Sequence, residues 1–379
     1  DARLADYPEL PRPFQIVLQE LGQRFYNEFN HMVYEHSVLD GAGLVHRFMS
    51  PPNEVGLRLV KTFTFTPDSY LVDLQIELIN ESGSNIRFGD GARGLGLIMG
   101  PGLGGSGNGG RYDRYSTVDA VLLGDDFLHE HISKPAPGSV TMAEELTIDR
   151  TIHTGPYSWG GIVSKYFAGV VIPDEASPFT GGLAMLDNRV LGTLTNDRDS
   201  AVRYPLVQLF GAPFMLEAGR SISFDYTVYM GPKQKELLDE AGHDLTRVMF
   251  HNSSGFMRGL CMLLLVVLFW LHDLLRNWGL AIMALTVLVR LATLPIVHKA
   301  MKSQAKMTQE MAKIRPLVEK VNEKYKNDPQ RKQQELMKLY REHNINPLAM
   351  LKGCGFMLIQ LPIFIGLYTL LYQVIDLRG

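Results

Sequence analysis

The stretch WGLAIMALTVLVRLATLPIV, residues 278–297, holds apolar or small residues almost throughout, with a single arginine at position 290. An α-helix rises about 1.5 Å per residue, so this stretch extends about 30 Å, the thickness of the hydrocarbon core of a bilayer. It therefore predicts a transmembrane helix within residues 276–298. Arg290 would lie about 18 Å from the outer end of that helix and about 10 Å from its cytoplasmic end.

Two threonines accompany the arginine. Thr286, Arg290 and Thr293 stand at i, i+4 and i+7, which places them on one face of a helix. An arginine facing lipid at this depth costs at least about 2.5–3.5 kcal/mol on insertion scales. Its long stem could snorkel towards the inner interface, or a water-filled cavity could keep the guanidinium hydrated. The neighbouring threonines favour the cavity, and both interpretations stay open.

A second apolar stretch, GCGFMLIQLPIFIGLYTLLYQVI, covers residues 353–375 and predicts another transmembrane helix within residues 347–376. Gln360 is a polar residue within this stretch, and Phe364 and Tyr368 follow on its face. Pro295 and Pro362 can bend the two helices and open space between them. Gln360, Phe364 and Tyr368 therefore join the candidate polar site.

The connector between the two stretches is basic, with 12 Lys and Arg against 6 Asp and Glu from His298 to Asn346. The positive-inside rule places it in the cytoplasm. Apolar residues step by four and three, which predicts a coiled-coil seam: Met307, Met311, Ile314, Val318, Val321 and Tyr325. KNDPQ at 326–330 breaks this helix and RKQQELMKLYREH begins another. Residues 299–346 therefore predict a helical hairpin, whose charged face is either simply solvated or a docking surface.

The segment before the first span allows two interpretations. GLCMLLLVVLFWL at 259–271 has about 13 apolar residues, whereas a crossing needs about 20. We therefore expect residues 256–275 to form a helix lying in the membrane interface, with a true span as the alternative. Residues 233–255 predict an amphipathic connecting helix.

The remaining two thirds of the chain differ in charge and pattern. Residues 1–255 carry 20 basic and 32 acidic residues, against 17 and 8 in residues 256–379, so the two parts suit different environments. Within 71–79, Leu, Asp, Gln, Glu and Ile alternate with Val, Leu, Ile and Leu, the period of a strand with one buried face. Similar runs recur up to position 232. The fold is therefore expected to be mixed, with an antiparallel β-sandwich at 1–232 outside the membrane and a helical membrane domain after it.

The sequence shows no enzyme chemistry. Gly100, Gly102 and Gly105 satisfy a dinucleotide-binding pattern, but Pro101 and the glycines that follow predict a loop rather than the required helix. No His, Cys or Glu spacing suits a metal, and no nucleophile motif is present. We therefore expect no catalysis, no metal and no cofactor.

Several motifs resemble one family. NWGLAIMALTVLVR, KMTQEMAKIRP, DPQRKQQELMKLYREHNINPL and LIQLPIFIGLYTLL are similar, in order and spacing, to the core of the YidC membrane protein insertases, which include the mitochondrial and chloroplast insertases. The similarity covers residues 278–378. KTFTFTPDSYLVDLQIELIN and SKYFAGVVIP resemble, more loosely, the large periplasmic domain of the Gram-negative members.

The resemblance implies a function. Such proteins insert and help fold proteins of the bacterial inner membrane, through a hydrophilic groove within the inner leaflet. Arg290 matches the groove arginine, and Thr286, Gln360 and Phe364 match positions that line the groove or contact substrate. The implied partners are nascent membrane proteins, the ribosome, the Sec translocon, a targeting receptor and membrane lipid, without any specific nucleic-acid sequence.

One departure and two alternatives accompany this interpretation. The family core has five spans after the periplasmic domain, whereas this sequence ends after the second, so we expect either truncation at both ends or a split gene. An extracytoplasmic receptor, whose sandwich binds a sugar or peptide while the hairpin relays a signal, is the alternative from another class. A transporter subunit is weaker, because the spans carry one charge and no repeat.

Overall fold

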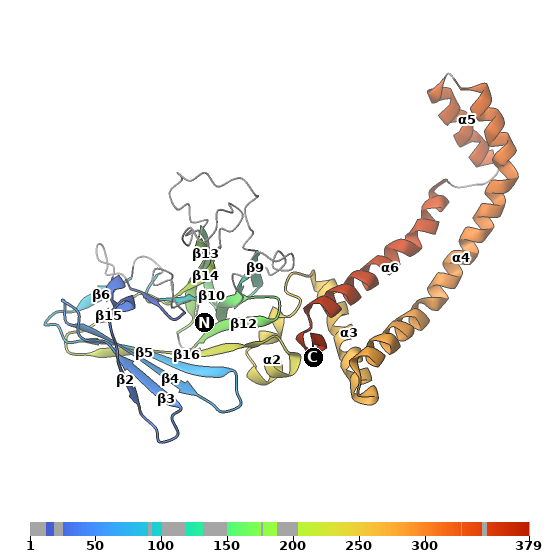
Figure 1. The fold of residues 1–379 in the computed structure, drawn as a ribbon. Coiled ribbons are helices and arrows are strands. Elements are labelled where there is room, and N and C mark those ends of the chain that lie inside the picture. Colours follow the sequence, from blue (N-terminus) through green and yellow to red (C-terminus); the bar gives the residue numbers. More distant parts are fainter. Residues whose placement is uncertain are drawn as a thin grey trace, which may run out of the picture. The chain divides into compact units, whose positions relative to one another are not determined.

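The computed structural model describes residues 13–18, 26–89, 93–100, 119–131, 150–175, 177–187, 204–326, 328–342 and 347–378. The chain divides into two compact units. The first comprises residues up to 252 together with 374–378, and the second comprises residues 253–373. The predicted order, a β domain followed by a helical membrane domain, is confirmed (Figure 1).

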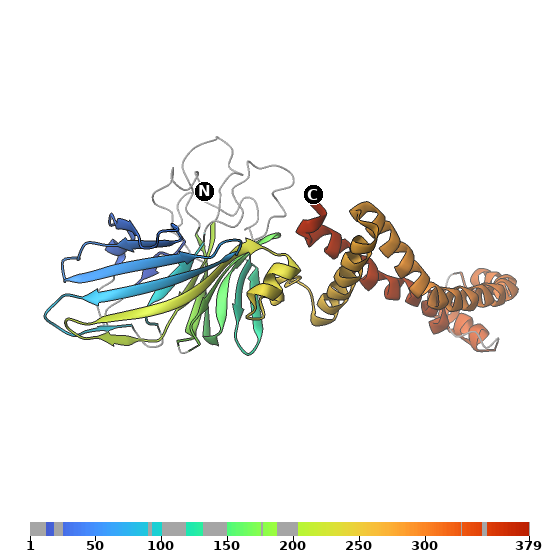
Figure 2. The ribbon, with the colours of Figure 1, turned by 90° about the horizontal axis from the view of Figure 1, so that it is seen from below.

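The first unit is built on a nine-stranded antiparallel sheet (Figure 2). Its strands, in spatial order, are β2 (Glu35–Val38), β3 (Val45–Met49), β4 (Leu57–Phe65), β5 (Leu71–Asn80), β16 (Ser221–Pro232), β12 (Phe167–Pro173), β11 (Trp159–Val163), β8 (Asp119–Leu123) and β9 (Phe127–His131).

Two smaller sheets and a short helix complete the sandwich. The five-stranded sheet contains, in order, β1 (Ile16–Val17), β7 (Gly96–Met99), β14 (Tyr204–Phe210), β13 (Phe179–Asp187) and β10 (Arg150–Tyr157). A two-stranded sheet pairs β15 (Phe214–Leu216) with β6 (Ile86–Phe88), and the 3-10 helix η1 covers Asn27–Asn30. Leu59, Ile76 and Val228 of the large sheet lie in one buried cluster with Leu97 and Leu209 of the five-stranded sheet. The predicted antiparallel sandwich is confirmed.

The alternation in β5 explains why this segment is a strand. Leu74, Ile76 and Leu78 are buried, whereas Asp73 and Gln75 on the opposite side are exposed. Successive side chains of a strand point to opposite faces, so the apolar set reaches the core together. The predicted burial pattern of this segment is confirmed.

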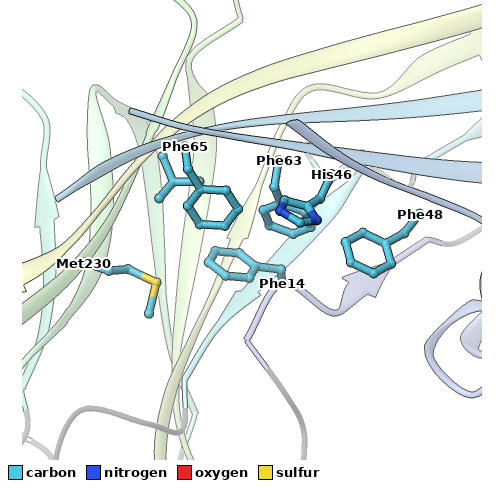
Figure 3. Close-up of a pocket in the computed structure, with 7 residues that line it drawn as sticks. Phe14, His46, Phe48, Phe63, Phe65 and Met230 are labelled. Carbon is cyan, nitrogen blue, oxygen red and sulfur yellow. The ribbon is translucent and has the colours of Figure 1, made fainter. Parts of the chain in front are cut away.

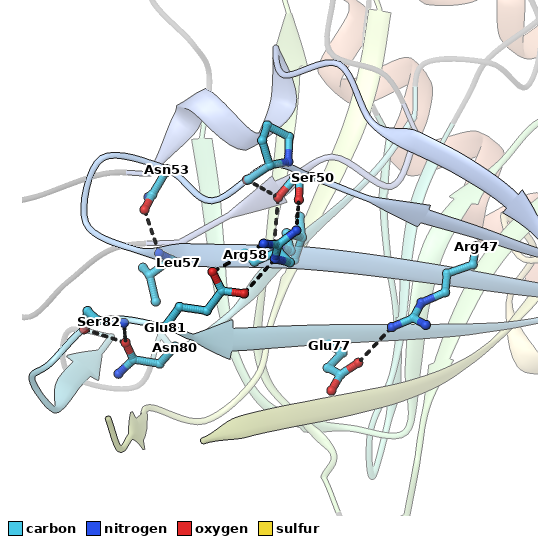
Figure 4. Close-up of polar contacts among 11 residues, drawn as sticks. Arg47, Ser50, Asn53, Leu57, Arg58, Glu77, Asn80, Glu81 and Ser82 are labelled. Carbon is cyan, nitrogen blue, oxygen red and sulfur yellow. Dashed lines mark hydrogen bonds and ion pairs between the residues drawn. The ribbon is translucent and has the colours of Figure 1, made fainter. Parts of the chain in front are cut away.

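Polar contacts close the ends of β4 and β5 (Figure 4). Asn53 accepts a hydrogen bond from the Leu57 amide at 2.8 Å, which forms the turn into β4. Arg58 contacts Glu81 through Nε at 2.9 Å. Asn80 is fully buried and donates to the Leu216 carbonyl at 3.2 Å. Asn53 and Asn80 satisfy backbone groups that would otherwise be unpaired where strands end.

The connecting segment, residues 233–255, is not the single amphipathic helix predicted from sequence. It contains α2 (Lys235–Ala241) and the 3-10 helix η3 (Leu245–Val248). Gly242, His243 and Asp244 all have positive φ, at 71°, 50° and 60°. A left-handed backbone ends a helix, so the segment breaks there.

The second unit contains four helices among its described residues: α3 (Gly255–Leu275), α4 (Trp278–Lys324), α5 (Pro329–Glu342) and α6 (Pro347–Gln373). A short 3-10 helix, η4 (Ile375–Arg378), follows. α4 joins the predicted span and the first arm of the hairpin in one helix of 47 residues, about 70 Å long. The sequence-based boundary near 298 therefore marks a change of environment and not a break in the helix.

The hairpin forms between α4 and α5. Ile314 is 3% exposed, and Val318, Val321 and Tyr325 of the predicted seam are partly buried. The break falls after Lys324, as KNDPQ predicted, and Pro329 begins α5, a position that suits proline because its missing amide would have no helical partner.

Two helices are long and apolar enough to cross a membrane among the described residues, Gly255–Leu275 and Trp278–Lys299. The first begins before the apolar run counted from sequence, so its 21 residues fit the alternative of a true span. The interfacial placement of this helix stays a prediction.

Candidate functional site

The predicted polar face lies on α4. Arg290 and Thr286 are exposed on the helix surface, whereas Thr293 is 9% exposed. The three residues therefore share a side of α4, but Thr293 turns towards its neighbours and the other two turn away. Arg290 has no hydrogen-bond or ion-pair partner in the part of the chain that the structure describes.

The two threonines are satisfied by their own helix. Thr286 Oγ1 donates to the Ile282 carbonyl at 2.9 Å, and Thr293 Oγ1 donates to the Val289 carbonyl at 2.9 Å. Such bonds allow a hydroxyl to reside in apolar surroundings and tend to bend the helix. The Arg290 guanidinium is thus the polar group of this helix face that makes no hydrogen bond among the described residues.

The second set of predicted residues lies on α6. Phe364 and Tyr368 are 68% and 63% exposed, and Gln360 one turn before them is partly buried. The ring of Tyr368 stacks on Tyr372 with the centroids 5.8 Å apart. Among the described side chains, no hydrogen bond joins this set to Arg290. That the two sets line one groove stays a prediction.

Close packing brings α3 against α6. The Cys261 thiol donates to the Gly366 carbonyl at 3.7 Å. A Cβ at Gly366 would lie 3.3 Å from Leu260 Cδ2, so a larger side chain has little room. Small residues allow such approach between membrane helices. This contact fixes the helix that carries Gln360, Phe364 and Tyr368.

The sandwich contains an apolar cavity of about 390 Å³, which we call the aromatic pocket (Figure 3). It lies on the inner side of β3, β4, β5 and β16. Its lining residues are Phe14, His46, Phe48, Phe63, Phe65, Val72 and Met230. His46 is the one lining side chain with a polar atom. A sugar site needs several convergent polar groups, so this pocket does not suit the sugar-binding alternative.

A lysine supports the wall of the pocket. Lys61 Nζ donates to the Phe14 carbonyl at 2.7 Å and lies 5.8 Å from the centre of the Tyr34 ring. Burial lowers the pKa of Lys61 to about 8. Phe14 has φ 64°, a left-handed conformation that costs a bulky residue about 1–2 kcal/mol. The lysine contact therefore offsets part of the strain that directs the Phe14 ring into the pocket.

A buried polar cluster joins the connecting segment to β8. His251 Nε2 donates to Asp119 at 2.5 Å, and Asn252 Nδ2 donates to the same carboxylate at 2.9 Å. Lys233 is 4% exposed, and its ammonium lacks a hydrogen-bond partner among the described residues. Burial lowers the pKa of Lys233 to about 8, and Asp119 partly opposes this. Burial also lowers the pKa of His251.

Comparison with known families assigns both parts of the chain. Residues 43–250, more than half of the chain, match the family described as the YidC periplasmic domain. The chain belongs to the YidC family. Residues 270–379 match the family described as the 60Kd inner membrane protein, which agrees with the apolar helices of the second unit. The resemblance inferred from sequence is confirmed, and the YidC assignment places the protein in the inner membrane with the sandwich as its periplasmic domain.

Curated relatives carry the same name. A membrane protein insertase YidC from Syntrophus aciditrophicus is 30% identical over 85% of this chain and 52% of its own length. The YidC of Geotalea daltonii is 29% identical over 86% of this chain and 54% of its own. That of Cupriavidus taiwanensis is 29% identical over 90% and 54%. The chain thus spans about half the length of the curated YidC proteins it matches.

Solved structures give a weaker likeness. An α-galactosidase from Geobacillus stearothermophilus shares 8% identity at a TM-score of 0.34, covering 62% of this chain and 32% of the other. A putative aldose 1-epimerase from Escherichia coli shares 8% identity at a TM-score of 0.29, over 52% and 68%. Similarity at this level supports no statement about function.

Two features of this chain were not located from sequence: the aromatic pocket and the buried polar cluster. The alternation of Phe63 and Phe65 in β4 was a signal for the first, since both rings must share a face. The described residues contain no group of three His, Cys, Asp or Glu that could hold a metal. The absence of a cofactor and of catalysis stays an expectation, and the glycine-rich stretch from Gly102 lies outside the described residues.

Proposed function

We propose that this protein inserts membrane proteins into the inner membrane and assists their folding, using Arg290 as the charged group of a hydrophilic groove. One observation carries the proposal: an unpartnered, exposed arginine lies in a helix long and apolar enough to cross a bilayer. Intramembrane charges are costly and are usually kept for function. The YidC family assignment supports insertion as that function.

The arginine acts by electrostatics. Two opposite charges 4 Å apart attract by about 1 kcal/mol in water and by about 4 kcal/mol at an effective dielectric constant near 20. Arg290 would bind an acidic or polar part of a nascent chain and lower the cost of moving it through the bilayer. Apolar client segments would then leave along α4 and α6, past Phe364 and Tyr368. No covalent step is involved.

Further residues take supporting roles in this proposal. Gln360 offers an amide near the polar part of the client, and Thr286 and Thr293 keep the helix surface polar at low cost because their hydroxyls are satisfied within α4. The basic hairpin of α4 and α5 would contact the ribosome, the Sec translocon or a targeting receptor on the cytoplasmic side. Membrane lipid would surround α3, α6 and the part of α4 up to Lys299.

The test is insertion in cells depleted of their own insertase and complemented with variants. Arg290→Glu combined with Thr286→Ala should reduce insertion of dependent clients at least tenfold, while Arg290→Lys, which keeps the charge, should retain most of it. Leu291→Ala, an exposed neighbour, is the matched control. Unchanged insertion of every dependent client by the double variant would show that the groove mechanism is wrong.

A further inference from the structure

The edge of the nine-stranded sheet lies beside the aromatic pocket. Among the described strands, β2 pairs only with β3. The Leu39 amide donates to the Val45 carbonyl at 2.9 Å, which marks these two residues as the position of a hydrogen-bonded pair, although the Val45 amide donates instead to the Asp40 carboxylate. Such pairs alternate along an antiparallel ladder, and therefore the backbone N–H and C=O groups of His36 and Val38 point away from β3.

The His36 side chain contacts the pocket walls, and Val38 lies on the same face of β2. His36 Nε2 lies 3.0 Å from His46 Nδ1, and the His36 ring stacks on Phe48 with centroids 4.8 Å apart. His46 and Phe48 are walls of the pocket (Figure 3). The open backbone of β2 and the aromatic pocket are thus parts of one continuous surface.

The chemistry of this surface is selective. The pocket presents aromatic rings, the His46 imidazole, a valine and a methionine, and its residues Phe65 and Met230 are 43% and 41% exposed. Val38 of the neighbouring β2 is 48% exposed. No carboxylate belongs to the described lining. An acyl chain could enter the pocket but has no groups for the backbone of β2. An extended polypeptide has both, because it offers amides and carbonyls at its edge and directs every second side chain to one face.

We propose that this surface binds an extended apolar segment of another polypeptide by strand addition alongside β2. The backbone of the segment pairs with His36 and Val38, and alternate aromatic or aliphatic side chains enter the aromatic pocket. This inference rests on the proposed function, because it names the client segments that the periplasmic domain holds: apolar, strand-forming stretches that lack acidic or basic side chains on the inward face.

The test is fluorescence anisotropy with the whole chain in nanodiscs and a labelled nine-residue peptide, Lys-Thr-Phe-Thr-Val-Thr-Phe-Thr-Lys. The peptide should bind, and empty nanodiscs should not bind it. Phe65→Ser should weaken binding at least tenfold because it removes a pocket wall. Val38→Pro should do the same because it removes an edge amide without breaking a bond to β3. Ser37→Ala is the control, because it keeps every backbone amide and changes a side chain on the opposite face of β2. It should leave the affinity unchanged.

A second measurement keeps the protein unaltered. The same peptide, N-methylated at the amides that would face β2, should bind at least tenfold more weakly. Equal affinity of the two peptides would overturn strand addition. Binding of laurate without any binding of the peptide would make the pocket a lipid site and would also overturn the inference.

The inference and the proposed function can fail separately. Arg290→Glu combined with Thr286→Ala should leave peptide affinity unchanged while it reduces insertion at least tenfold. Lost peptide binding with intact insertion would reject only the strand-addition surface. Intact peptide binding in a protein whose insertion does not depend on Arg290 would reject only the groove.

Discussion

The carboxylate of Asp119 and the imidazole of His251 are hydrogen-bonded at 2.5 Å although 132 positions separate them in sequence. Both side chains are almost completely buried, at 1% and 6% exposure. Asp119 begins β8, and His251 lies four residues before α3. Within the first unit, the segment that contains His251 is therefore held against a strand of the sandwich.

Asp119→Ala should destabilise the sandwich by about 3–5 kcal/mol, because it leaves the buried Lys233 ammonium uncompensated and His251 without its acceptor. Trp159 reports the change, since its indole donates to the His243 carbonyl of the connecting segment at 2.8 Å. Urea unfolding followed by Trp159 fluorescence, with Trp270 and Trp278 replaced by Phe, is the measurement. Asp125→Ala, an exposed carboxylate in the next turn, is the control. Equal midpoints for the two variants would contradict this role.

The stability of the sandwich should rise with pH above neutrality because of Lys233. Its pKa is about 8 in the fold against an ordinary value of 10.5. Between these values the unfolded chain binds more protons than the folded chain, so the free energy of unfolding increases as pH rises through this window. Lys233→Met should reduce that slope, whatever its effect at a single pH, and leave the part due to Lys61, whose pKa burial also lowers to about 8. Lys235→Met, which alters a partly exposed lysine of α2, should keep the slope of the unaltered protein in urea titrations from pH 8 to 10.5.

Gly161→Ala should cost about 3 kcal/mol or more, at the upper end of the usual range for overpacking. A Cβ there would lie 2.0 Å from the Gly169 carbonyl oxygen and 2.8 Å from Val170 Cα. These are backbone atoms of the paired strand β12, which cannot rotate away. Gly41→Ala, with nothing within 4 Å of the new Cβ, should change stability by less than about 0.5 kcal/mol. Thermal unfolding of the two variants side by side decides the point.

The periodicity of apolar residues predicted much of the fold. In β5 the alternation of Leu74, Ile76 and Leu78 with polar residues was sufficient to predict a half-buried strand, and the seam around Ile314 predicted the hairpin. Both depend on neighbours within a few positions, which a sequence displays directly. The break in the connecting segment was missed because His243 and Asp244 adopt positive φ without being glycine.

The candidate sites depend on residues that are far apart in the sequence. Phe14, Phe48, Phe65 and Met230 come from separate strands or loops, and only sheet order brings them to one pocket. Arg290 was apparent from sequence, because a charge within an apolar run needs no knowledge of partners to be noticed. Whether one groove contains the remaining predicted residues depends on how α4 and α6 are rotated about their own axes. Neither periodicity nor the contacts described above decide that rotation. These residues are Thr286, Thr293, Gln360, Phe364 and Tyr368.

Ile314→Lys should open the cytoplasmic hairpin. Ile314 is 3% exposed at the seam between α4 and α5, and a buried ammonium without a partner is strongly unfavourable. Backbone amides of α5 should then exchange with deuterium at least tenfold faster. Leu317→Lys places the same side chain on a position that is already 37% exposed, and it should leave the exchange of α5 unchanged. Equal protection in both variants would mean that the seam does not hold the hairpin.

Gly366→Ile should separate α3 from α6, because the added atoms meet Leu260 and Leu264, within 3.5 Å of a new Cβ. The Cys261 thiol, fully buried beside the Gly366 carbonyl, would then become accessible. In a Cys354→Ser background, N-ethylmaleimide should label Cys261 at least tenfold faster. Gly259→Ile adds the same bulk where nothing lies within 4 Å, so it should not change the labelling rate. A rate that stays the same in Gly366→Ile would show that α6 approaches α3 without depending on this glycine.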